Sequence, residues 1–278
     1  MNKKSKTILV TGASSGIGRE TAIRLAKEGH KVFAGIRRKV DKIEIEKLSK
    51  NIQGVYLDVA NQSSIDKAFW FVMKNTDKID VLINNAGIVV AGPVEFLDIK
   101  KLKEQFDVNT FGALLVVQKF LPLLNNGRII NISSMASTGI FPFISPYCAS
   151  KRAMDILFNS FSVENKNNIK VISVKPAAIK TPIWNKSVKS TRESFENINE
   201  IAKEKYLKEL FFLEKNALEN NNKGIEIYVV VDKIIEIINA KNPKSTYNVG
   251  IQAVLADVIS KLPQDFINRL IKFRLGKI

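Results

Sequence analysis

Residues 11–18 read Thr11-Gly12-Ala13-Ser14-Ser15-Gly16-Ile17-Gly18, a glycine-rich turn between a short apolar run and a segment of helical periodicity. Gly12 permits a tight turn, Gly16 lets the backbone approach a pyrophosphate without a Cβ clash, and Gly18 lets a helix pack closely on a strand. The helix start would offer its free N–H groups to phosphate oxygens. A glycine triplet alone is also typical of a flexible loop. The strand before it and the helix after it favour a nucleotide site formed by Gly12, Ser14, Ser15, Gly16, Ile17 and Gly18.

Apolar runs and helix-length segments alternate along most of the chain on both sides of this turn. The runs are almost continuously apolar, as expected of parallel strands covered on both faces, and they span Thr7–Val10, Lys31–Ile36, Gly54–Val59, Val81–Ala86, Arg128–Ser133, Lys170–Lys175 and Thr246–Val249. The periodic segments span Ile17–Glu28, Asp41–Lys50, Ser63–Lys74, Ile99–Leu124 and Pro146–Glu164. This alternation predicts an α/β fold: one domain over residues 1–278, with a doubly wound, seven-stranded parallel sheet flanked by helices.

One region interrupts the alternation. Residues 182–224 are rich in Lys, Glu, Asn and Ser, with aromatic side chains scattered among them at Phe195, Tyr206, Phe211 and Phe212. Because a final strand follows, we interpret this region as a helical insertion and not as a second domain.

Composition limits which partners, disulfides and metal sites the chain can have. The 278 residues carry 43 Lys and Arg against 27 Asp and Glu, and the net charge of +16 is compatible with nucleic acid, an anionic membrane surface or an anionic cofactor. The lysines are spread along the chain and no nucleic-acid motif is present, so no nucleic-acid partner is expected. The single cysteine, Cys148, excludes an intramolecular disulfide and a cysteine-based zinc site. The single histidine, His30, argues against a metal site and follows Gly29, where it is predicted to cap a helix end.

Two features bear on location. No stretch reaches the ~18–20 apolar residues of a spanning helix, and the first apolar run is too short for a signal-peptide core, so a cytoplasmic protein is expected. The tail 262–278 is basic and amphipathic, with Phe266 and Leu270 on one side and Arg269 and Lys272 on the other. It would dock on a neighbouring subunit or on the insertion, with peripheral membrane contact as the second alternative.

The end of the second strand selects the nucleotide. An NAD site would place Asp or Glu there to bind the ribose 2′-hydroxyl, but the chain has Arg37 and Arg38. Two arginines in a basic chain can be merely solvated. With the acid missing, their guanidinium groups favour the 2′-phosphate of NADP, and NAD is the less favoured cofactor. At the ends of the next two strands, Asp58 and Val59 would lie near the adenine, and Asn85, Ala86 and Gly87 would continue the cofactor crevice.

A tyrosine and a lysine follow at helical spacing. Tyr147 and Lys151 are four residues apart, so they share one helix face. At ~5 Å and an effective dielectric constant of ~20, the ammonium would stabilise a phenolate by about 3 kcal/mol. That energy would bring the tyrosine pKa from ~10 toward ~8, where the phenol can exchange the proton that accompanies hydride transfer. Such a pair can also be an ordinary surface pair. The surface-pair interpretation is less convincing because Ser133 and Ser134 follow at the end of the fifth strand, where a hydroxyl could bind a substrate oxygen.

Taken together, these motifs resemble the short-chain dehydrogenase/reductase family from Lys6 to about Gly250. The matching residues are the glycine turn, Asn84-Asn85-Ala86-Gly87, Asn109, Ser134 and Tyr147-x-x-x-Lys151. The resemblance implies a Rossmann fold, an NADP(H)-dependent oxidoreductase acting on an alcohol, ketone or aldehyde, and a dimer or tetramer whose helices 99–124 and 146–164 meet between subunits. A non-catalytic nucleotide sensor or scaffold of the same fold is the alternative.

The resemblance also implies residue roles. Tyr147 would be the general acid/base, Lys151 would bind the nicotinamide ribose, Ser134 would orient the substrate, and Asn109 would anchor a water in a proton relay. After the sixth strand, Pro176, Ile179 and Thr181 would contact the cofactor. Ala177 stands where the family usually has glycine, and alanine would cost ~1 kcal/mol or more if that position required a positive φ.

The substrate is expected to be apolar, since the family branch that the chain most resembles contains hydroxysteroid and retinol dehydrogenases. The insertion would form a substrate lid, and Phe141 and Phe143 lie close in sequence to the active serine. The same aromatic side chains could equally be core or interface residues.

Overall fold

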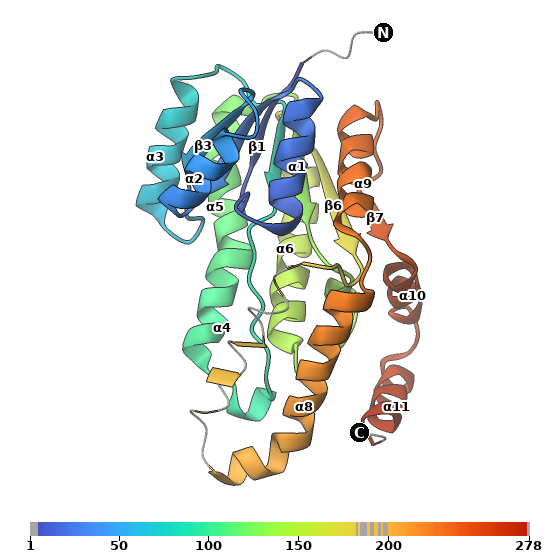
Figure 1. The fold of residues 1–278 in the computed structure, drawn as a ribbon. Helices are drawn as coiled ribbons and strands as arrows, with labels where there is room; N and C mark the ends of the chain where they lie inside the picture. Colours follow the sequence, from blue (N-terminus) through green and yellow to red (C-terminus); the bar gives the residue numbers. More distant parts are fainter. Residues whose placement is uncertain are drawn as a thin grey trace.

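The strands form one parallel sheet. The computed structural model describes residues 5–181, 183, 188–189, 192–193, 196 and 200–276. Within these residues, the sheet has seven strands in the order β3-β2-β1-β4-β5-β6-β7. The strands are β1 (Thr7–Val10), β2 (Lys31–Ile36), β3 (Ile52–Tyr56), β4 (Val81–Asn84), β5 (Arg128–Ile132), β6 (Lys170–Pro176) and β7 (Thr246–Val249). The predicted doubly wound parallel sheet is confirmed (Figure 1).

Helices cover both faces of the sheet (Figure 1). Strand residues alternate between two apolar clusters: Ile8 and Val10 belong to one cluster and Leu9 to the other. On the first face lie α1 (Gly16–Lys27), α2 (Lys39–Glu46) and α9 (Ile227–Asn239), and on the second α3 (Gln62–Met73), α5 (Gly112–Phe120) and α6 (Ser145–Glu164). Burial on both sides explains why the strands contain so few polar residues.

The third strand begins and ends earlier than expected. The sequence predicts a strand over Gly54–Val59, whereas β3 spans Ile52–Tyr56 and pairs Ile52 with Val32 of β2. Leu57 and Val59 are buried although they lie beyond the strand. The apolar run therefore continues into a loop that packs on the core, and hydropathy alone could not mark where strand pairing stops.

The long helix predicted for Ile99–Leu124 is divided. It consists of α4 (Ile99–Phe106), the π-helical turn η2 (Asp107–Phe111), α5, and the 3₁₀ turn η3 (Leu121–Leu123). A Cβ added to Gly112 would lie 2.7 Å from the Val59 carbonyl oxygen and 2.8 Å from that of Asp107. Glycine therefore allows the chain leaving the π turn to pass directly against the loop after β3.

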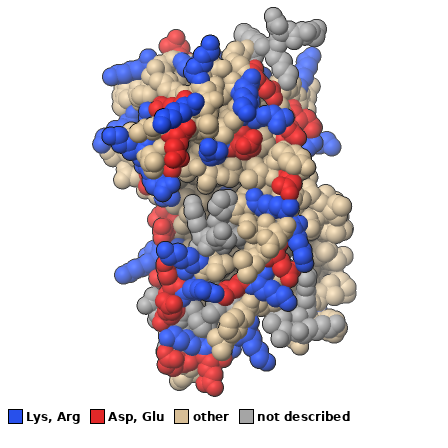
Figure 2. Space-filling model, in the orientation of Figure 1, with Lys and Arg blue, Asp and Glu red and all other residues tan. Residues whose placement is uncertain are grey.

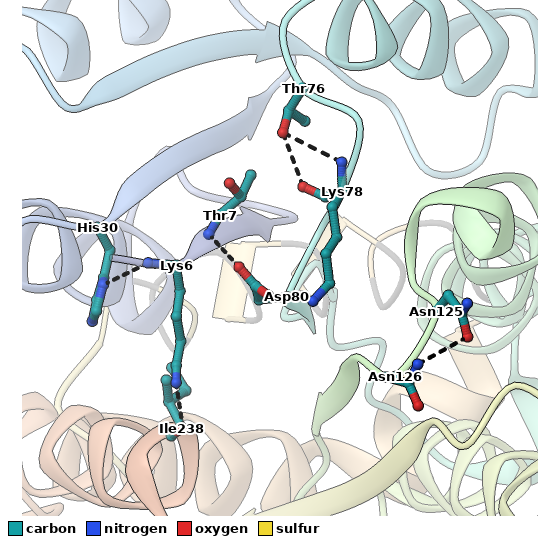
Figure 3. Close-up of polar contacts among 9 residues, drawn as sticks. All are labelled: Lys6, Thr7, His30, Thr76, Lys78, Asp80, Asn125, Asn126 and Ile238. Atoms are coloured by element: carbon teal, nitrogen blue, oxygen red, sulfur yellow. Dashed lines mark hydrogen bonds and ion pairs between the residues drawn. The ribbon is translucent and has the colours of Figure 1, made fainter. Parts of the chain in front are cut away.

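Polar contacts close the amino ends of β1 and β4 (Figure 3). The Thr7 N–H donates to Asp80 Oδ2 at 2.9 Å, and Lys78 Nζ lies 3.0 Å from Asp80 Oδ1. The turn that follows α1 lies at the same end of the sheet.

His30 joins the end of α1 to the start of β1. Its backbone N–H donates to the Leu25 carbonyl at 3.1 Å, beyond Gly29 at φ +86°, which closes the helix with a left-handed residue. Its ring nitrogen Nδ1 accepts the Lys6 N–H at 3.2 Å, and Lys6 Nζ donates to the Ile238 carbonyl in α9 at 3.3 Å (Figure 3). His30 thus caps α1 through its backbone and ties the chain before β1 through its ring.

Three further helices lie away from the sheet faces. Helix α8 (Glu200–Lys223) extends below the sheet in Figure 1 and accounts for the later part of the predicted insertion. Its Tyr206 hydroxyl donates to Glu95 Oε2 at 2.7 Å, in the 3₁₀ turn η1 (Val94–Phe96). Phe195 lies outside the described residues, and the single-domain assignment and the lid stay predictions.

Helices α10 (Ile251–Ile259) and α11 (Gln264–Leu275) form the C-terminal end. In α11, Ile267 is buried while Phe266 and Leu270 are exposed, and the docking of this tail stays a prediction. Among the residues described, no helix combines the length and apolar character that crossing a membrane would require.

Candidate active site

A cavity of about 330 Å³ opens at the carboxyl ends of the strands, where β1 and β4 are neighbours and the strand order reverses direction. Open α/β sheets bind ligands at such a switch point. The cavity brings together most of the residues singled out in the sequence: Gly12, Ser14, Ser15, Gly16, Ile17, Arg37, Asp58, Val59, Asn85, Ala86, Gly87, Ser134, Tyr147, Lys151, Pro176, Ile179 and Thr181. Gly18, Arg38 and Asn109 are not part of its wall.

The glycine turn forms one end of the cavity. Gly12 and Gly16 have φ values of +64° and +58°, which favour glycine. Gly18 lies beneath the turn: a Cβ there would come within 2.3 Å of Asn85 Nδ2, which donates to the carbonyls of Thr11 and Gly12 at 3.0 Å each. The third glycine is therefore needed for the close packing of α1 against the end of β4.

The start of α1 is suited to an anion. Ser15, its N-cap residue, makes no side-chain cap hydrogen bond, and the first turn contains no acidic residue. The first N–H groups of the helix and its partial positive charge therefore face the cavity without an internal carboxylate competing for them. This donor set fits a pyrophosphate.

Thr11 ties the turn to the fourth strand. Its hydroxyl oxygen accepts the N–H groups of Asn85 and Ala86, both at 3.0 Å. Sequence reasoning assigned no role to this side chain, because its partners lie more than seventy residues away. A threonine at the end of the first strand, with two asparagines at the end of the fourth, is the signal that could have indicated the contact.

The two arginines after β2 lie differently. Arg37 lines the cavity. The Arg38 guanidinium forms a two-pronged ion pair with Asp41, with Nε 2.7 Å from Oδ2 and an Nη atom 2.6 Å from Oδ1, and this contact raises the pKa of Arg38. A bidentate pair holds a guanidinium in one orientation, so the structure brings only one of the two arginines to the cavity.

Tyr147 and Ser134 both line the cavity, and the Ser134 side chain lies close enough to the phenol to lower its pKa. Burial raises the pKa of Tyr147 to about 12, and the Ser134 side chain only partly opposes that effect. The expectation that Lys151 would bring this pKa toward 8 is wrong for this structure. Partial desolvation of the phenol disfavours the charged phenolate, and the Lys151 nitrogen is 6.0 Å from the ring centre.

Lys151 is buried at the base of the cavity. Its Nζ donates to the Ile132 carbonyl at the end of β5 at 2.8 Å. Burial lowers the pKa of Lys151 to about 8, and the charge of Asp155 acts in the opposite direction. The ammonium keeps two further N–H donors, in a region where a Cβ on Gly87 would lie 3.5 Å from Nζ.

Asn109 occupies the π turn and holds two segments together. Its Oδ1 accepts the Ile88 N–H at 2.8 Å, while its Nδ2 donates to the Ile88 carbonyl at 2.9 Å and to Ser150 Oγ at 3.0 Å. The side-chain amide therefore joins the loop after β4 to helix α6. Any water that Asn109 anchored would have to use its backbone carbonyl or the remaining lone pair of Oδ1.

One neighbour of these residues answers a question that the sequence raised. Ala177 does not have a positive φ, so alanine carries no backbone strain there. Its methyl group instead packs over Gly250, where a Cβ would come within 3.0 Å of the Ala177 Cβ.

Ser133, the other serine at the end of β5, also lines the cavity and is buried, and its hydroxyl has no hydrogen-bond partner among the described residues.

A buried carboxylate lies behind the cavity, and no sequence motif points to it. Asp155, one turn after Lys151 on α6, is 2% exposed. It pairs with Lys175 Nζ at 3.0 Å and accepts hydrogen bonds from Ser137 at 2.7 Å and Ser173 at 3.1 Å. The partners come from β6 and from the 3₁₀ turn η4 (Met135–Ser137), so only the folded chain brings them together.

The cavity wall beside Tyr147 is apolar. The cavity that holds Tyr147 and Ser134 is also lined by Val89, Met135, Phe141, Ile144 and Ile183. Phe143 is not part of the wall. Cys148 is buried, and burial raises the pKa of its thiol to about 11, as expected of a packing residue. The described residues of α8 do not line the cavity.

The surface charge is dispersed. On the face shown in Figure 2, Lys and Arg side chains are scattered over both ends of the molecule, with Asp and Glu side chains between them. The basic residues of this face do not gather into one patch.

Sequence comparisons identify relatives along most of the chain. A family model described as short chain dehydrogenase matches residues 6–192. The NADPH-dependent 3-dehydrocapnine reductase of Ornithobacterium rhinotracheale is 32% identical over 253 residues, covering 87% of this chain and 87% of that protein. The 3-ketodihydrosphingosine reductase of Bacteroides thetaiotaomicron is 30% identical over 267 residues, covering 94% of each.

Solved structures show the same fold. A short-chain dehydrogenase from Streptomyces avermitilis superimposes with a TM-score of 0.78 at 22% identity, covering 99% of this chain and 98% of that one. A serine dehydrogenase in complex with NADP+ gives a TM-score of 0.73 at 21% identity, covering 87% and 94%. At these identities the likeness concerns the fold alone.

Proposed function

Because this chain belongs to the short-chain dehydrogenase/reductase family and is accordingly an NAD(P)-dependent oxidoreductase, we propose that it reduces the carbonyl group of an apolar ketone or aldehyde with NADPH. The observation that carries the proposal is the cavity in which Ser134, Tyr147 and Lys151 lie between the glycine turn and an apolar wall. The relatives named above are reductases, and one of them is named as NADPH-dependent.

The residues of the cavity fit a nicotinamide dinucleotide. The uncapped start of α1 and the glycine turn would hold the pyrophosphate. Arg37 would pair with the 2′-phosphate, since no carboxylate stands at the end of β2 to select the unphosphorylated ribose. Asp58 and Val59 would line the adenine side, and Pro176, Ile179 and Thr181 the nicotinamide side.

We assign the proton transfer to Tyr147. A pKa of about 12 keeps the phenol protonated at neutral pH, which is the form needed to donate a proton to a carbonyl oxygen as it gains negative charge. Ser134, which lines the same cavity, would donate to the same oxygen and fix its position. When bound, NADPH supplies the hydride that the carbonyl carbon receives.

Lys151 and Asn109 would support this pair. The free N–H donors of Lys151 would bind the nicotinamide ribose and place positive charge near the phenol as its proton leaves. Asn109 holds the loop at Gly87 and Ile88 against α6. It would therefore keep the ribose site at a fixed position relative to Tyr147.

The apolar wall favours a substrate without charge near the reacting carbon. This wall carries neither a cation nor a carboxylate, because its side chains are Val89, Met135, Phe141, Ile144 and Ile183. A charged group placed against them would lose its hydration without compensation. Ketones carried on an aliphatic or ring skeleton fit this wall.

The test is a screen of NADPH consumption over ketones, aldehydes, steroids, retinoids and sugars, run in parallel with Tyr147→Phe. The variant keeps the ring but lacks the proton, so turnover should fall by about 10²–10⁴-fold while NADPH binding, followed by fluorescence, is unchanged. Comparable turnover by the variant would remove Tyr147 from this role. Tight NADPH binding with no turnover of any compound would favour the nucleotide-sensing alternative.

A further inference from the structure

The buried carboxylate behind the cavity connects three segments that carry proposed site residues. Asp155 lies on α6 with Tyr147 and Lys151, its partner Ser137 lies three residues after Ser134, and Lys175 lies directly before Pro176. All four polar groups of the cluster are nearly inaccessible to water. Resting on the function proposed above, we propose that Asp155 is a positioning residue that holds the Ser134 turn against α6 and keeps the Lys151 ammonium charged.

The positioning part follows from the hydrogen bonds. Asp155 Oδ2 accepts from Ser137 Oγ at 2.7 Å, in the first turn after the serine that contacts Tyr147. Oδ1 accepts from Ser173 Oγ at 3.1 Å. The carboxylate thus links α6 to two neighbouring segments, to η4 through Oδ2 and to β6 through both oxygens, since Lys175 also pairs with Oδ2. Charge-assisted hydrogen bonds of this kind are short and directional.

The charge part follows from burial. Removing Lys151 from water disfavours its ammonium form, and the carboxylate one turn later on the same helix favours it. Lys175, the cation beside Asp155, limits how much negative charge Lys151 experiences. On the same helix, the titratable side chain of Tyr147 also lies near Lys151, with its ring centre 6.0 Å from Nζ. From η2, Asn109 and Thr110 bond to Ser150 of α6, and from η4, Ser137 bonds to Asp155; all three are neutral.

The two charged members of the cluster can be separated experimentally. Asp155→Asn alone would leave the Lys175 ammonium buried without a partner, which is severely destabilising. The double variant Asp155→Asn/Lys175→Met removes both charges and keeps similar volumes. Lys175→Met alone leaves the Asp155 carboxyl group with its two serine donors but without its cation, which is also destabilising; where this variant folds, Lys151 has one cation fewer near it.

The double variant and Lys175→Met should shift the titration of Lys151 in opposite directions. Its titration can be followed without any cofactor, by the ¹³Cε chemical shifts of labelled lysine, with Lys151→Met identifying the signal. In the double variant, Lys151 should lose its proton at lower pH than in the wild type, where its pKa is about 8. In Lys175→Met it should lose its proton at higher pH.

A second readout is NADPH binding. If Lys151 must be charged to bind the ribose, the double variant should bind NADPH roughly fivefold more weakly at pH 8 and almost normally at pH 6. The matched control is Asp66→Asn/Lys119→Met, which makes the same two replacements at an ion pair of 2.6 Å joining α3 and α5. That control should move neither the titration nor the binding.

The outcomes are distinct. A Lys151 titration that stays at the wild-type pH in both cluster variants would overturn the inference, because a merely structural cluster would lower stability and leave this titration in place. If the double variant does not fold, Asp155→Asn/Lys175→Gln, which keeps a hydrogen-bonding amide at each position, takes its place, and its Lys151 titration decides by the direction of its shift. A displaced titration in a protein that reduces no carbonyl compound would overturn the proposed function and leave the link between Asp155 and Lys151 intact.

Discussion

At the scale of single residues, Arg37 and Arg38 show how neighbours of one type can differ in use. Both were predicted to bind a 2′-phosphate, because sequence alone cannot distinguish two adjacent guanidinium groups. The folded chain gives Arg38 a carboxylate partner in Asp41 and leaves Arg37 at the cavity wall. Selection between the two coenzymes should therefore depend on Arg37.

Arg37→Ala should weaken NADPH binding by about 10–100-fold, the value of one or two hydrogen bonds to a charged group. NADH binding should change little, since NADH lacks the 2′-phosphate. Dissociation constants for both coenzymes, measured by fluorescence titration, give the comparison. Arg38→Ala is the matched control and should affect NADPH binding less. Equal losses for NADPH and NADH in Arg37→Ala would contradict this assignment.

The residues that sequence reasoning found are those whose relation is local. Tyr147 and Lys151 are one helical turn apart, so their shared face follows from helix geometry. The partners of Asp155 could not be found in this way, because Ser137 and Lys175 come from separate segments and meet it only after the sheet forms. The tyrosine pKa was predicted in the wrong direction for the same reason, since burial depends on the whole fold.

At the scale of elements, the π turn Asp107–Phe111 determines where Asn109 lies. Hydropathy predicted one continuous helix there, because apolar residues recur at helical spacing through both α4 and α5. A π turn inserts one residue without changing that pattern enough to be recognised. The same limit applies to β3, whose run of apolar residues continues past the end of strand pairing.

Gly112→Ala tests the π turn. The added Cβ would meet two backbone oxygens below 3 Å, so the chain must shift, and overpacking of this kind destabilises by about 1–3 kcal/mol. Urea denaturation measures the loss. Gly139→Ala is the matched control, because its Cβ would meet only the Phe141 ring at 3.7 Å, an ordinary contact. Unchanged stability of Gly112→Ala would show that the close approach to Val59 is not needed.

At the scale of the whole molecule, apolar side chains on α6 remain exposed although the sheet is covered on both faces. Ile156 is 54% exposed and Val163 87%, and they lie seven residues apart, on one side of the helix. Exposed apolar residues that line up on one helix are typical of contact surfaces between subunits. The meeting of helices 99–124 and 146–164 in a dimer or tetramer stays a prediction, and these side chains are the candidate contact surface on α6.

Ile156→Glu should disrupt such an oligomer, because a carboxylate buried between subunits without a partner is strongly disfavoured. Light scattering should show a dimer or tetramer for the wild type and a smaller species for the variant. Val254→Glu on α10 introduces the same charge at another exposed apolar site, 49% exposed in the structure, and should leave the assembly intact. A wild-type protein that is monomeric at working concentration would contradict the expectation.

One end of the sheet has a practical consequence. At this end, Thr7 contacts Asp80 and Lys6 contacts His30 (Figure 3). The amino ends of the strands lie here, opposite the carboxyl ends where the cavity opens. A bead, an electrode or a fused reporter protein attached at Ser5 would therefore lie on the side of the enzyme opposite the opening of the cavity, which would face the solution. Immobilised in that orientation, the protein could be washed with successive compounds and its coenzyme recycled in place.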